Sequence, residues 1–386
     1  MTATALSIPT QASQMSKGKW IHNRQWDLAF ISFSVILVPI PYLIWVLMSD
    51  VLRVESDFGR QAVNLLIAVL IGGPHMYATF TRTAFDQDFR KNYGGFIRSS
   101  IIIPLIVVTL ALTNLTLLLT IFFFWASIHV LHQIIFVVAS YDQKAEKAAD
   151  RERNGYQAQN KVRDTLSPLS RIIDYAVVLT SLYPLAAYRI AISQDFSIGP
   201  THLNDTIPAV FEQPWIVYAA FAAFITAVTA FIIKSIIEWR NGTAHVPKII
   251  FISLTALASF IVPSLGNLDT AFQGMNVWHS FQYLALTWYI NRLRSDRGDL
   301  SSKPMLKRMS EDGKARLFYG FNLALTAGAG IVIAVVFSIL HFVIGGKWAE
   351  ASFALETSYY IGVLSFLWIH YYHDHFLFTQ TDSVLT

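Results

Sequence analysis

The chain has 386 residues, of which 54% are hydrophobic and only 14% are charged, with a formal net charge of +4 and a mean hydropathy of +0.45. Soluble domains carry about a quarter charged residues, so this composition indicates an integral membrane protein and argues against a nucleic-acid-binding one. The sequence contains no cysteine, which excludes disulfides, iron–sulfur clusters and any thiolate-ligated metal or haem.

Apolar runs of about 18–25 residues are long enough to cross a bilayer as helices. Ten such runs predict an all-α, polytopic integral membrane helical bundle: 26–48, 61–80, 98–114, 115–140, 170–192, 214–237, 248–265, 271–291, 318–345 and 354–379. Only Thr113 and Asn114 separate the third run from the fourth, which predicts a tight helical hairpin there.

The distribution of Lys and Arg predicts the topology. These residues gather after the second, fourth, sixth and eighth runs, whereas the connections 194–213 and 266–270 contain none. Because positive charge marks the cytoplasmic side, we expect ten transmembrane helices with both termini in the cytoplasm. The predicted organisation is a cytosolic tail at 1–25, a single transmembrane domain at 26–380 and a C-terminal tail at 381–386. The protein would be multi-pass, in the plasma membrane or another inner membrane.

Seven of the eleven histidines fall inside predicted spans that run toward the cytoplasmic side. They lie roughly 5–12 residues from the cytoplasmic end of each span, or about 8–18 Å deep at 1.5 Å per residue. Four separate helices therefore present imidazole at one shared depth, which predicts that the rings meet. The seven are His75, His129, His132, His279, His370, His373 and His375. The remaining histidines, His22, His202, His245 and His341, are interpreted as interfacial or loop residues.

The last span is the most polar at its end, because His370, His373 and Asp374 share one helical face at spacings of three and four. Burying such groups costs free energy unless they are paired or bound to a metal. Imidazole and carboxylate suit iron, zinc, copper or manganese. A lone intramembrane histidine is more often a hydrogen-bonding group between helices, so the prediction depends on the set. The predicted metal ligands are His75, His129, His132, His279, His370, His373 and Asp374.

Polar side chains near the histidines are expected to orient the imidazoles by hydrogen bonds. This supporting set comprises His375, Asn276, Gln282, Tyr283 and Gln133. Aromatic neighbours of the histidines could line an apolar substrate tunnel, although ordinary helix packing explains each of them equally well. These aromatics are Trp125, Trp278, Trp368, Tyr371 and Tyr372. The pattern identifies no catalytic residue, and Gly72-Gly73-Pro74 predicts a kink just before His75.

Ligation by nitrogen and oxygen alone favours one or two non-haem iron ions that activate dioxygen. A site within the hydrocarbon layer suits a lipophilic substrate such as a carotenoid, a fatty acyl chain, a sterol or a quinone. We therefore expect a membrane oxygenase whose partners are this substrate, membrane lipids and an electron donor. Two alternatives remain open: a b-type haem electron-transfer protein with bis-histidine ligation, and a proton-coupled transporter whose histidines relay protons.

The order of these motifs resembles that of the Brp/Blh-type membrane β-carotene dioxygenases. The matching motifs are Gly72-Gly73-Pro74-His75, Ile128-His129, His279-Ser280 and the acid-containing segment at His370. The resemblance implies that intramembrane histidines, among them His75, His129 and His279, hold iron and that β-carotene is cleaved centrally to retinal. The sequence departs from that family at Tyr283, where the family has a further histidine. The HxxH and HxxHxH spacings are more loosely similar to those of membrane fatty-acid desaturases and hydroxylases.

Overall fold

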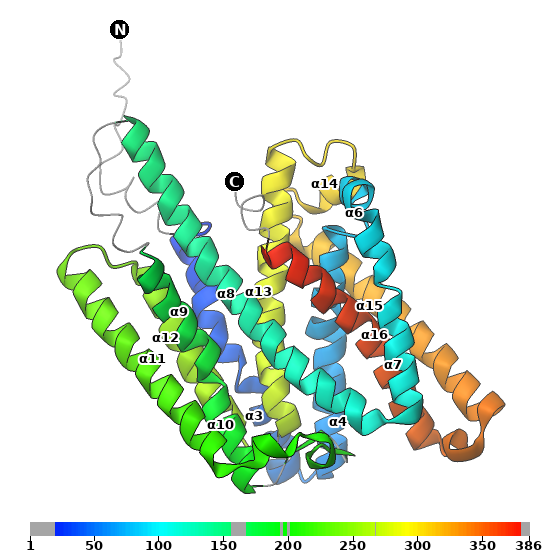
Figure 1. Cartoon of the computed structure of the whole chain (residues 1–386). Helices are drawn as coiled ribbons and strands as arrows, with labels where there is room; N and C mark the ends of the chain where they lie inside the picture. Colours follow the sequence, from blue (N-terminus) through cyan, green and yellow to red (C-terminus); the bar gives the residue numbers. More distant parts are fainter. Residues whose placement is uncertain (1–19, 156–166, 194–195, 199–200, 267, 380–386) are drawn as a thin grey trace.

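The computed structural model describes residues 20–155, 167–193, 196–198, 201–266 and 268–379 (Figure 1). Its helices are α2 (Arg24–Trp26), α3 (Ile40–Val46), α4 (Ser56–Ile67), α5 (Gly73–Ala78), α6 (Gln87–Ser99), α7 (Ile102–Thr113), α8 (Leu115–Gly155), α9 (Pro168–Ser181), α10 (Tyr183–Tyr188), α11 (Pro214–Arg240), α12 (Val246–Ile261), α13 (Leu268–Asp296), α14 (Pro304–Met309), α15 (Ala315–Ser338) and α16 (Ala351–Thr379). Short 3₁₀ and π-helical turns join several of these helices into longer rods. A two-stranded hairpin is formed by β1 (Ser197–Ile198) and β2 (Thr201–His202).

Eight helical stretches within the described residues are long and apolar enough to cross a membrane. They are Arg24–Val51, Ser56–Thr81, Gln87–Thr113, Leu115–Lys147, Pro168–Ile192, Pro214–Arg240, Val246–Ser264 and Ala315–Ile344. The chain is therefore an all-α, multi-pass helical bundle. The other two predicted spans form the long helices α13 and α16. Their many polar side chains lower their mean hydropathy below that of the eight stretches above. Ten spans, the cytoplasmic termini and the single domain stay predictions. The tail 381–386 and most of the tail 1–25 lie outside the described residues.

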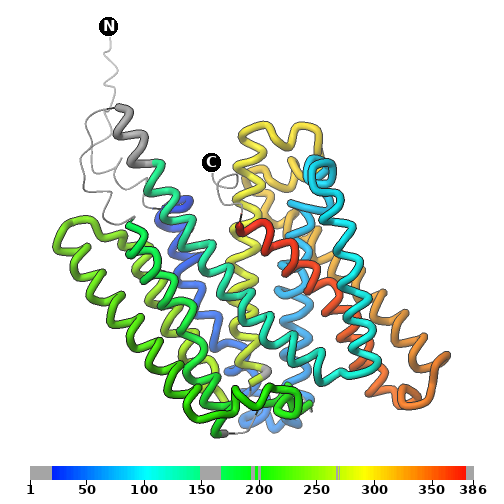
Figure 2. The backbone as a smooth tube through the Cα atoms, viewed as in Figure 1, coloured from blue at the N-terminus to red at the C-terminus, as the bar shows by residue number. Residues whose placement is uncertain are grey.

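Three central helices organise the bundle. Helix α13 packs against α3, α4 and α5, whereas α16 packs between α7 and α15 and also contacts α8. Helix α8 runs diagonally across the molecule, and the helices α9–α12 lie together on one side of it (Figure 2). Helix α12 also packs against the first helical stretch. Helix α8 begins directly after α7, with Asn114 as the turn; the Asn114 side-chain oxygen accepts a hydrogen bond from the amide of Leu117. The predicted break at this position is therefore present in the structure.

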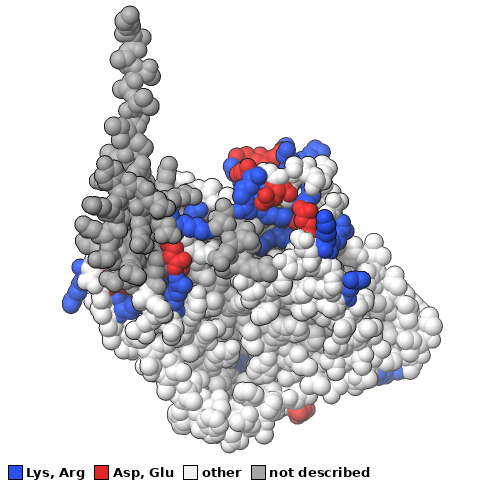
Figure 3. Space-filling view, turned by 45° about the horizontal axis from the view of Figure 1, so that its top comes forward, with Lys and Arg blue, Asp and Glu red and all other residues white. Residues whose placement is uncertain are grey.

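Charged side chains gather at one end of the molecule, and the rest of the visible surface is almost free of them (Figure 3). Asp86, the N-cap of α6, lies in this region and forms ion pairs with Arg294 and with Lys303 at 2.8 Å. Burial alone would raise the pKa of Asp86, but these two cations outweigh it and hold the pKa below its usual value. The segment between α5 and α6 is thereby attached to the end of α13 and to the loop that follows α13.

A second group of charges is buried between α8, α9, α11 and α12. The Lys248 ammonium group lies 2.7 Å from an oxygen of Asp142 and 2.8 Å from one of Asp174. Lys234 forms ion pairs with Asp174 and, at 3.6 Å, with Glu238. Because isolated buried charges are costly, this network ties the four helices to one relative position.

The sequence Gly72-Gly73-Pro74 breaks the regular helix as predicted. A π-helical turn (Ala68–Gly72) precedes α5, and proline cannot donate the backbone hydrogen bond that the carbonyl of Leu70 would accept. The hydroxyl of Tyr319, on α15, donates to that carbonyl instead at 2.7 Å. The Leu70 carbonyl therefore keeps a hydrogen-bond partner at the break in the helix. The break turns His75, which follows Pro74, toward α13.

The backbone of α13 lies very close to that of the first helical stretch, Arg24–Val51. A Cβ atom added to Gly274 would lie 2.0 Å from the carbonyl oxygen of Val38. We expect Gly274→Ala to destabilise the protein by about 1–3 kcal/mol, because the helices must separate to admit the methyl group. The readout is the thermal unfolding midpoint in detergent, with Gly328→Ala as the control, since nothing lies within 4 Å of that position. Equal midpoints for the two variants would contradict the packing described here.

Candidate metal centre

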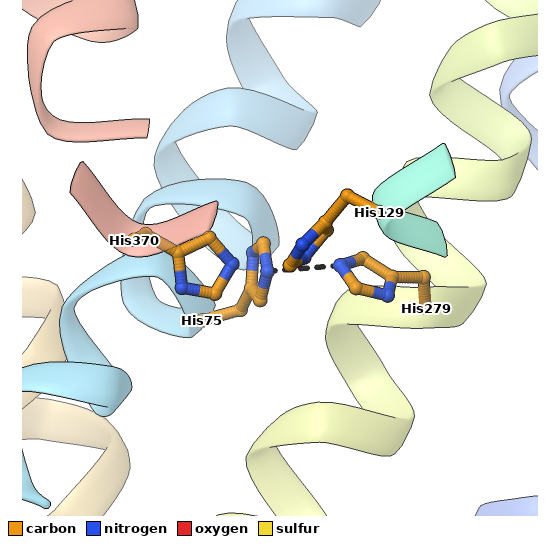
Figure 4. Close-up of side chains that lie close together, drawn as sticks. All are labelled: His75, His129, His279 and His370. Atoms are coloured by element: carbon orange, nitrogen blue, oxygen red, sulfur yellow. Dashed lines mark hydrogen bonds between the residues drawn. The ribbon is translucent and has the colours of Figure 1, made fainter. Parts of the chain in front are cut away.

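Four histidines from four different helices converge at the centre of the bundle (Figure 4). His75 comes from α5, His129 from α8, His279 from α13 and His370 from α16. One ligand nitrogen of each lies within 4.8 Å of those of the other three, and all four side chains are buried. The ring planes of His75 and His279 are nearly perpendicular, as are those of His75 and His370. Rings arranged in this way point their nitrogens at a shared space and do not stack.

The hydrogen bonds around His75 fix which of its ring nitrogens carries the proton. Its Nδ1 lies 2.9 Å from the carbonyl oxygen of Gly72 and 2.9 Å from the hydroxyl oxygen of Ser280. The Ser280 hydroxyl itself donates to the side-chain oxygen of Asn276 at 3.1 Å. Nδ1–H is therefore the donor, and Nε2 keeps its lone pair. This lone pair faces Nε2 of His279 at 3.0 Å.

A chain of hydroxyl groups orients His370 in the same way. The Thr79 hydroxyl donates to Asp374 Oδ1 at 2.9 Å and accepts from Nδ1–H of His370 at 2.5 Å. The Tyr283 hydroxyl donates to the same carboxylate oxygen at 2.6 Å. His370 consequently presents its Nε2 lone pair to the cluster. Metal-bound histidines characteristically donate their other ring N–H to a carboxylate, a carbonyl or a hydroxyl that is itself anchored.

The polar atoms left over at this site fit a cation. Nε2 of His129 and Nε2 of His370 are buried and have no hydrogen-bond partner within the described part of the chain. Oδ2 of Asp374 is equally buried and unpartnered there, 4.0 Å from Nε2 of His129. Leaving such groups unpaired costs roughly 1–3 kcal/mol each. A single metal ion bound by the four imidazoles would satisfy the nitrogens that face the cluster.

The structure does not bring the other predicted ligands into this cluster. His373 points away from it, because its two ring nitrogens each lie 2.9 Å from a hydroxyl, that of Thr83 and that of Ser100. His132 packs against His375, with ring centroids 5.1 Å apart, nearer the surface. Asp374 lies beside the cluster as the acceptor of the Thr79 and Tyr283 hydroxyls. Three residues along a helix turn the side-chain direction by about 300°. His370 therefore points into the cluster, whereas His373 points toward the end of α6, where it contacts Ser100.

Four of the five predicted supporting residues form hydrogen bonds near the centre. Asn276 accepts a hydrogen bond from Ser280, which in turn contacts His75, and Tyr283 donates a hydrogen bond to Asp374. The side-chain amide of Gln133 donates to the His279 carbonyl oxygen at 3.0 Å, while that of Gln282 donates to the Ile31 carbonyl oxygen at 2.7 Å. His375 is exposed and contacts His132.

Sequence analysis assigned no orienting role to the hydroxyl groups of Thr79 and Ser280, which contact the imidazoles of His370 and His75. Thr79 lies four residues after His75, and Ser280 lies directly after His279 and four residues after Asn276. That spacing could have identified them. Threonine and serine are nevertheless common in apolar helices, where they usually bond to their own backbone.

Three of the five predicted aromatic residues, Trp125, Tyr371 and Tyr372, line a cavity beside the cluster. The Tyr371 ring stacks on His129 with a centroid distance of 4.0 Å. Trp278 and Trp368 are almost fully buried and serve as packing residues, Trp368 against Trp125. Of the histidines interpreted as loop or interfacial residues, His202 lies in β2, His245 caps α12 and His341 lies in the π-helical turn that follows α15.

Comparisons with protein-family models, with curated proteins and with solved structures found no match for the chain. The resemblance to β-carotene dioxygenases therefore stays a prediction, and the functional argument depends on the geometry of the site.

The hydroxyl bridge from His370 to Asp374 yields a direct prediction. Thr79→Val keeps the shape of the side chain but removes the acceptor for the His370 N–H and a donor to Asp374. We expect the affinity for the metal to fall by roughly 10–100-fold, as is typical when a partner of a metal-bound histidine is lost. Titration with Fe²⁺ under anaerobic conditions measures this. Thr109→Val is the control, since its hydroxyl bonds only to the Leu105 carbonyl of its own helix; equal affinities in the two variants would refute the orienting role.

Proposed function

We propose that the protein is an integral-membrane, metal-dependent oxygenase that acts on a lipophilic substrate. The observation that carries this proposal is the buried cluster of His75, His129, His279 and His370, whose ligand nitrogens lie within 4.8 Å of one another. Imidazole ligands suit iron, copper, zinc and nickel, and an all-nitrogen set inside a membrane protein is suited to dioxygen chemistry on iron. The proposed cofactor is one ferrous ion.

The geometry favours a single ion over two. Imidazole nitrogens lie about 2.0–2.1 Å from a first-row metal ion, so ligands of one ion stand about 3–4 Å apart. The four nitrogens lie within 4.8 Å of one another, and those of His75 and His279 are 3.0 Å apart, which is close to that arrangement. Two ions would require further ligands, and His132 and His373 are engaged elsewhere. When bound, iron would supply the activation of dioxygen.

The residues around the cluster prepare it for such chemistry. His75 and His370 hold their protons at Nδ1, on the side away from the cluster, through Gly72 and Thr79. Oδ2 of Asp374 lies 4.0 Å from Nε2 of His129 and 3.5 Å from Nδ1 of His370, so a carboxyl group stands beside the site, where its ionised form would favour a bound cation. The apolar helices around the site exclude water, and this protects reactive oxygen species from side reactions.

The haem alternative is disfavoured by the same distances. Two histidines on opposite faces of a haem iron stand about 4 Å apart with the porphyrin between them. Nε2 of His75 and Nε2 of His279 are 3.0 Å apart, and the other two rings occupy the flanks where the macrocycle would lie. The transporter alternative is disfavoured by the orientation of the rings. Four imidazoles that point at one space, two of them held by hydrogen bonds on the opposite side of the ring, are more typical of a metal site than of a proton path.

Cleavage of a carbon–carbon double bond by dioxygen, with one oxygen atom placed on each carbon, consumes no external electrons. Hydroxylation or desaturation would need an electron donor. A double-bond dioxygenase acting on a carotenoid is thus the simplest form of the proposal and accords with the resemblance described above.

The test uses the purified protein in lipid nanodiscs, reconstituted with Fe²⁺ and supplied with ¹⁸O₂. β-Carotene and a panel of unsaturated fatty acyl lipids serve as substrates, and products are analysed by mass spectrometry. We expect ¹⁸O in the product, loss of product on iron removal, and recovery on adding iron back. Absence of oxygenated product from every substrate of the panel would contradict an oxygenase, and product formation after strict metal removal would contradict metal dependence.

A further inference from the structure

A cavity of about 260 Å³ lies between α8 and α16, beside the metal centre. From α8 it is lined by Trp125, Ile128, His129 and His132, and from α16 chiefly by Tyr371 and His375. On α8 these positions are spaced by three and four residues, so they form one continuous stripe along the helix. We name this space the α8/α16 cleft.

The inner wall of the cleft belongs to the metal centre. His129 contributes its ring to the cleft and also a buried nitrogen to the four-histidine cluster. Tyr371 covers that ring in a stacked contact, and its side chain is only 5% exposed. The Tyr371 hydroxyl forms no hydrogen bond with any residue that the structure describes. The cleft therefore reaches a predicted metal ligand, with an unpartnered hydroxyl beside it.

The outer wall of the cleft opens on the lipid-facing surface. Ile128, at its rim, is 57% exposed. It lies near the middle of the helical stretch Leu115–Lys147, which is long and apolar enough to cross a membrane, so we place it within the hydrocarbon layer. A molecule that enters here comes from the lipid and not from water.

The two ends of the cleft differ in polarity. At one end the Trp125 ring lies 5.1 Å from Trp368 and 5.9 Å from Tyr371, which makes an aromatic, apolar end. At the other end lie the imidazoles of His132 and His375. Both helices run toward the charged end of the molecule (Figures 1 and 3), so the histidine pair lies on the charged side of the cleft. The cleft is thus oriented like a lipid leaflet, with its hydrogen-bonding groups toward the polar surface.

We propose that the α8/α16 cleft is the substrate site and that its substrate is a long-chain molecule with a hydrogen-bonding end group, such as an alcohol, aldehyde or carboxylic acid. The end group binds His132 and His375, and the apolar chain lies against Ile128 and Trp125, beside His129. This assignment rests on the proposed function and narrows its substrate class to long chains with a polar end group, such as oxygenated carotenoids and fatty acids, so that β-carotene itself would be a poorer substrate than these. Complete ligand sites usually measure about 300–1,000 Å³. A smaller cleft that opens to lipid holds one part of a long molecule while the remainder stays in the bilayer.

The experiment maps where a long-chain probe binds in nanodiscs. The probe is hexadecanol with a photoreactive diazirine in mid-chain, and the comparison probe is the same hydrocarbon without the hydroxyl group. After irradiation, labelled peptides are identified by mass spectrometry. We expect hexadecanol to label Tyr371, which is too buried to be reached by lipid that merely lies on the surface. The hydrocarbon should label Tyr371 at least several-fold less.

Variants make the assignment specific. Ile128→Trp fills the rim of the cleft and should abolish labelling of Tyr371, whereas Ile225→Trp, at a similarly exposed position on α11, should leave it unchanged. His132→Ala combined with His375→Ala should reduce hexadecanol labelling to the hydrocarbon level. Absence of label on Tyr371, or equal labelling in Ile128→Trp, would overturn the proposal. Label confined to the apolar cavity behind α8, between Tyr183 and Phe272, would overturn it as well.

These outcomes are independent of the proposed oxygenase activity, because the labelling needs no metal and is carried out on the metal-free protein. Specific labelling together with failure of iron to bind would leave the lipid site standing and refute the oxygenase. Iron-dependent oxygenation without labelling of Tyr371 would retain the enzyme and refute this cleft as its substrate site.

Discussion

Replacing His370 by alanine is expected to abolish stoichiometric metal binding in the purified protein. His370 contributes one of the four converging nitrogens. Its Nε2 forms no hydrogen bond with the described residues, so metal binding is the role that this atom fits. Loss of a direct ligand should exceed the roughly 10–100-fold weakening that follows loss of an orienting partner. The same result is expected for His75→Ala, His129→Ala and His279→Ala. Metal analysis after gel filtration in detergent gives the readout.

The matched control for this prediction is His373→Ala, three residues further along the same helix. His373 is buried, but both of its ring nitrogens lie within hydrogen-bond distance of the hydroxyls of Thr83 and Ser100. We therefore expect this variant to retain its metal even if its thermal stability falls. A His373→Ala protein that lost its metal while His370→Ala kept it would show that the ligand set is wrong.

Replacing Lys248 by methionine is expected to cause the largest loss of stability among the substitutions considered. Its ammonium group is almost completely buried and lies between the carboxylates of Asp142 and Asp174. Removing it leaves Asp142 with only the more distant Arg171, at 3.8 Å, among the described residues, and leaves Lys234 to balance both Asp174 and Glu238. Breaking a buried ion pair in this way typically costs about 3–5 kcal/mol.

The measurement is the thermal unfolding midpoint and the yield of monodisperse protein. Lys307→Met, on the exposed surface of α14, is the control and should behave like the unaltered protein. Lys248→Arg keeps the positive charge, so its unfolding midpoint should fall less than that of Lys248→Met. If the methionine and control variants unfolded at the same temperature, the network would not hold α8, α9, α11 and α12 together. Metal content of the surviving Lys248→Met protein should stay normal, because the network lies apart from the cluster.

Much of the fold and part of the site could be predicted because their signals are local in the sequence. Apolar runs and the Asn114 break mark the helices, and the depth of a histidine within its span follows from counting residues. Equal depth was enough to predict that His75, His129, His279 and His370 meet, because each of these side chains also faces the bundle centre.

The remaining features depend on helix rotation, which residue counting does not provide. His132 and His373 lie at nearly the same depth as the cluster but face a lipid-side cleft and α6 respectively. A hydrophobic pattern that is almost uniform around a membrane helix gives little information about which face is inward. The orienting roles of Thr79 and Ser280 were missed for a related reason, because the value of a hydroxyl group depends on which imidazole packs beside it.

The central claim is that four imidazoles from four helices jointly hold one metal ion. The most direct test is X-ray absorption spectroscopy at the metal edge of iron-reconstituted protein, combined with the metal-to-protein ratio. We predict one ion per chain with about four imidazole nitrogens near 2.0–2.1 Å. A ratio near zero after reconstitution, or a metal whose coordination shell lacks several imidazoles, would contradict this account.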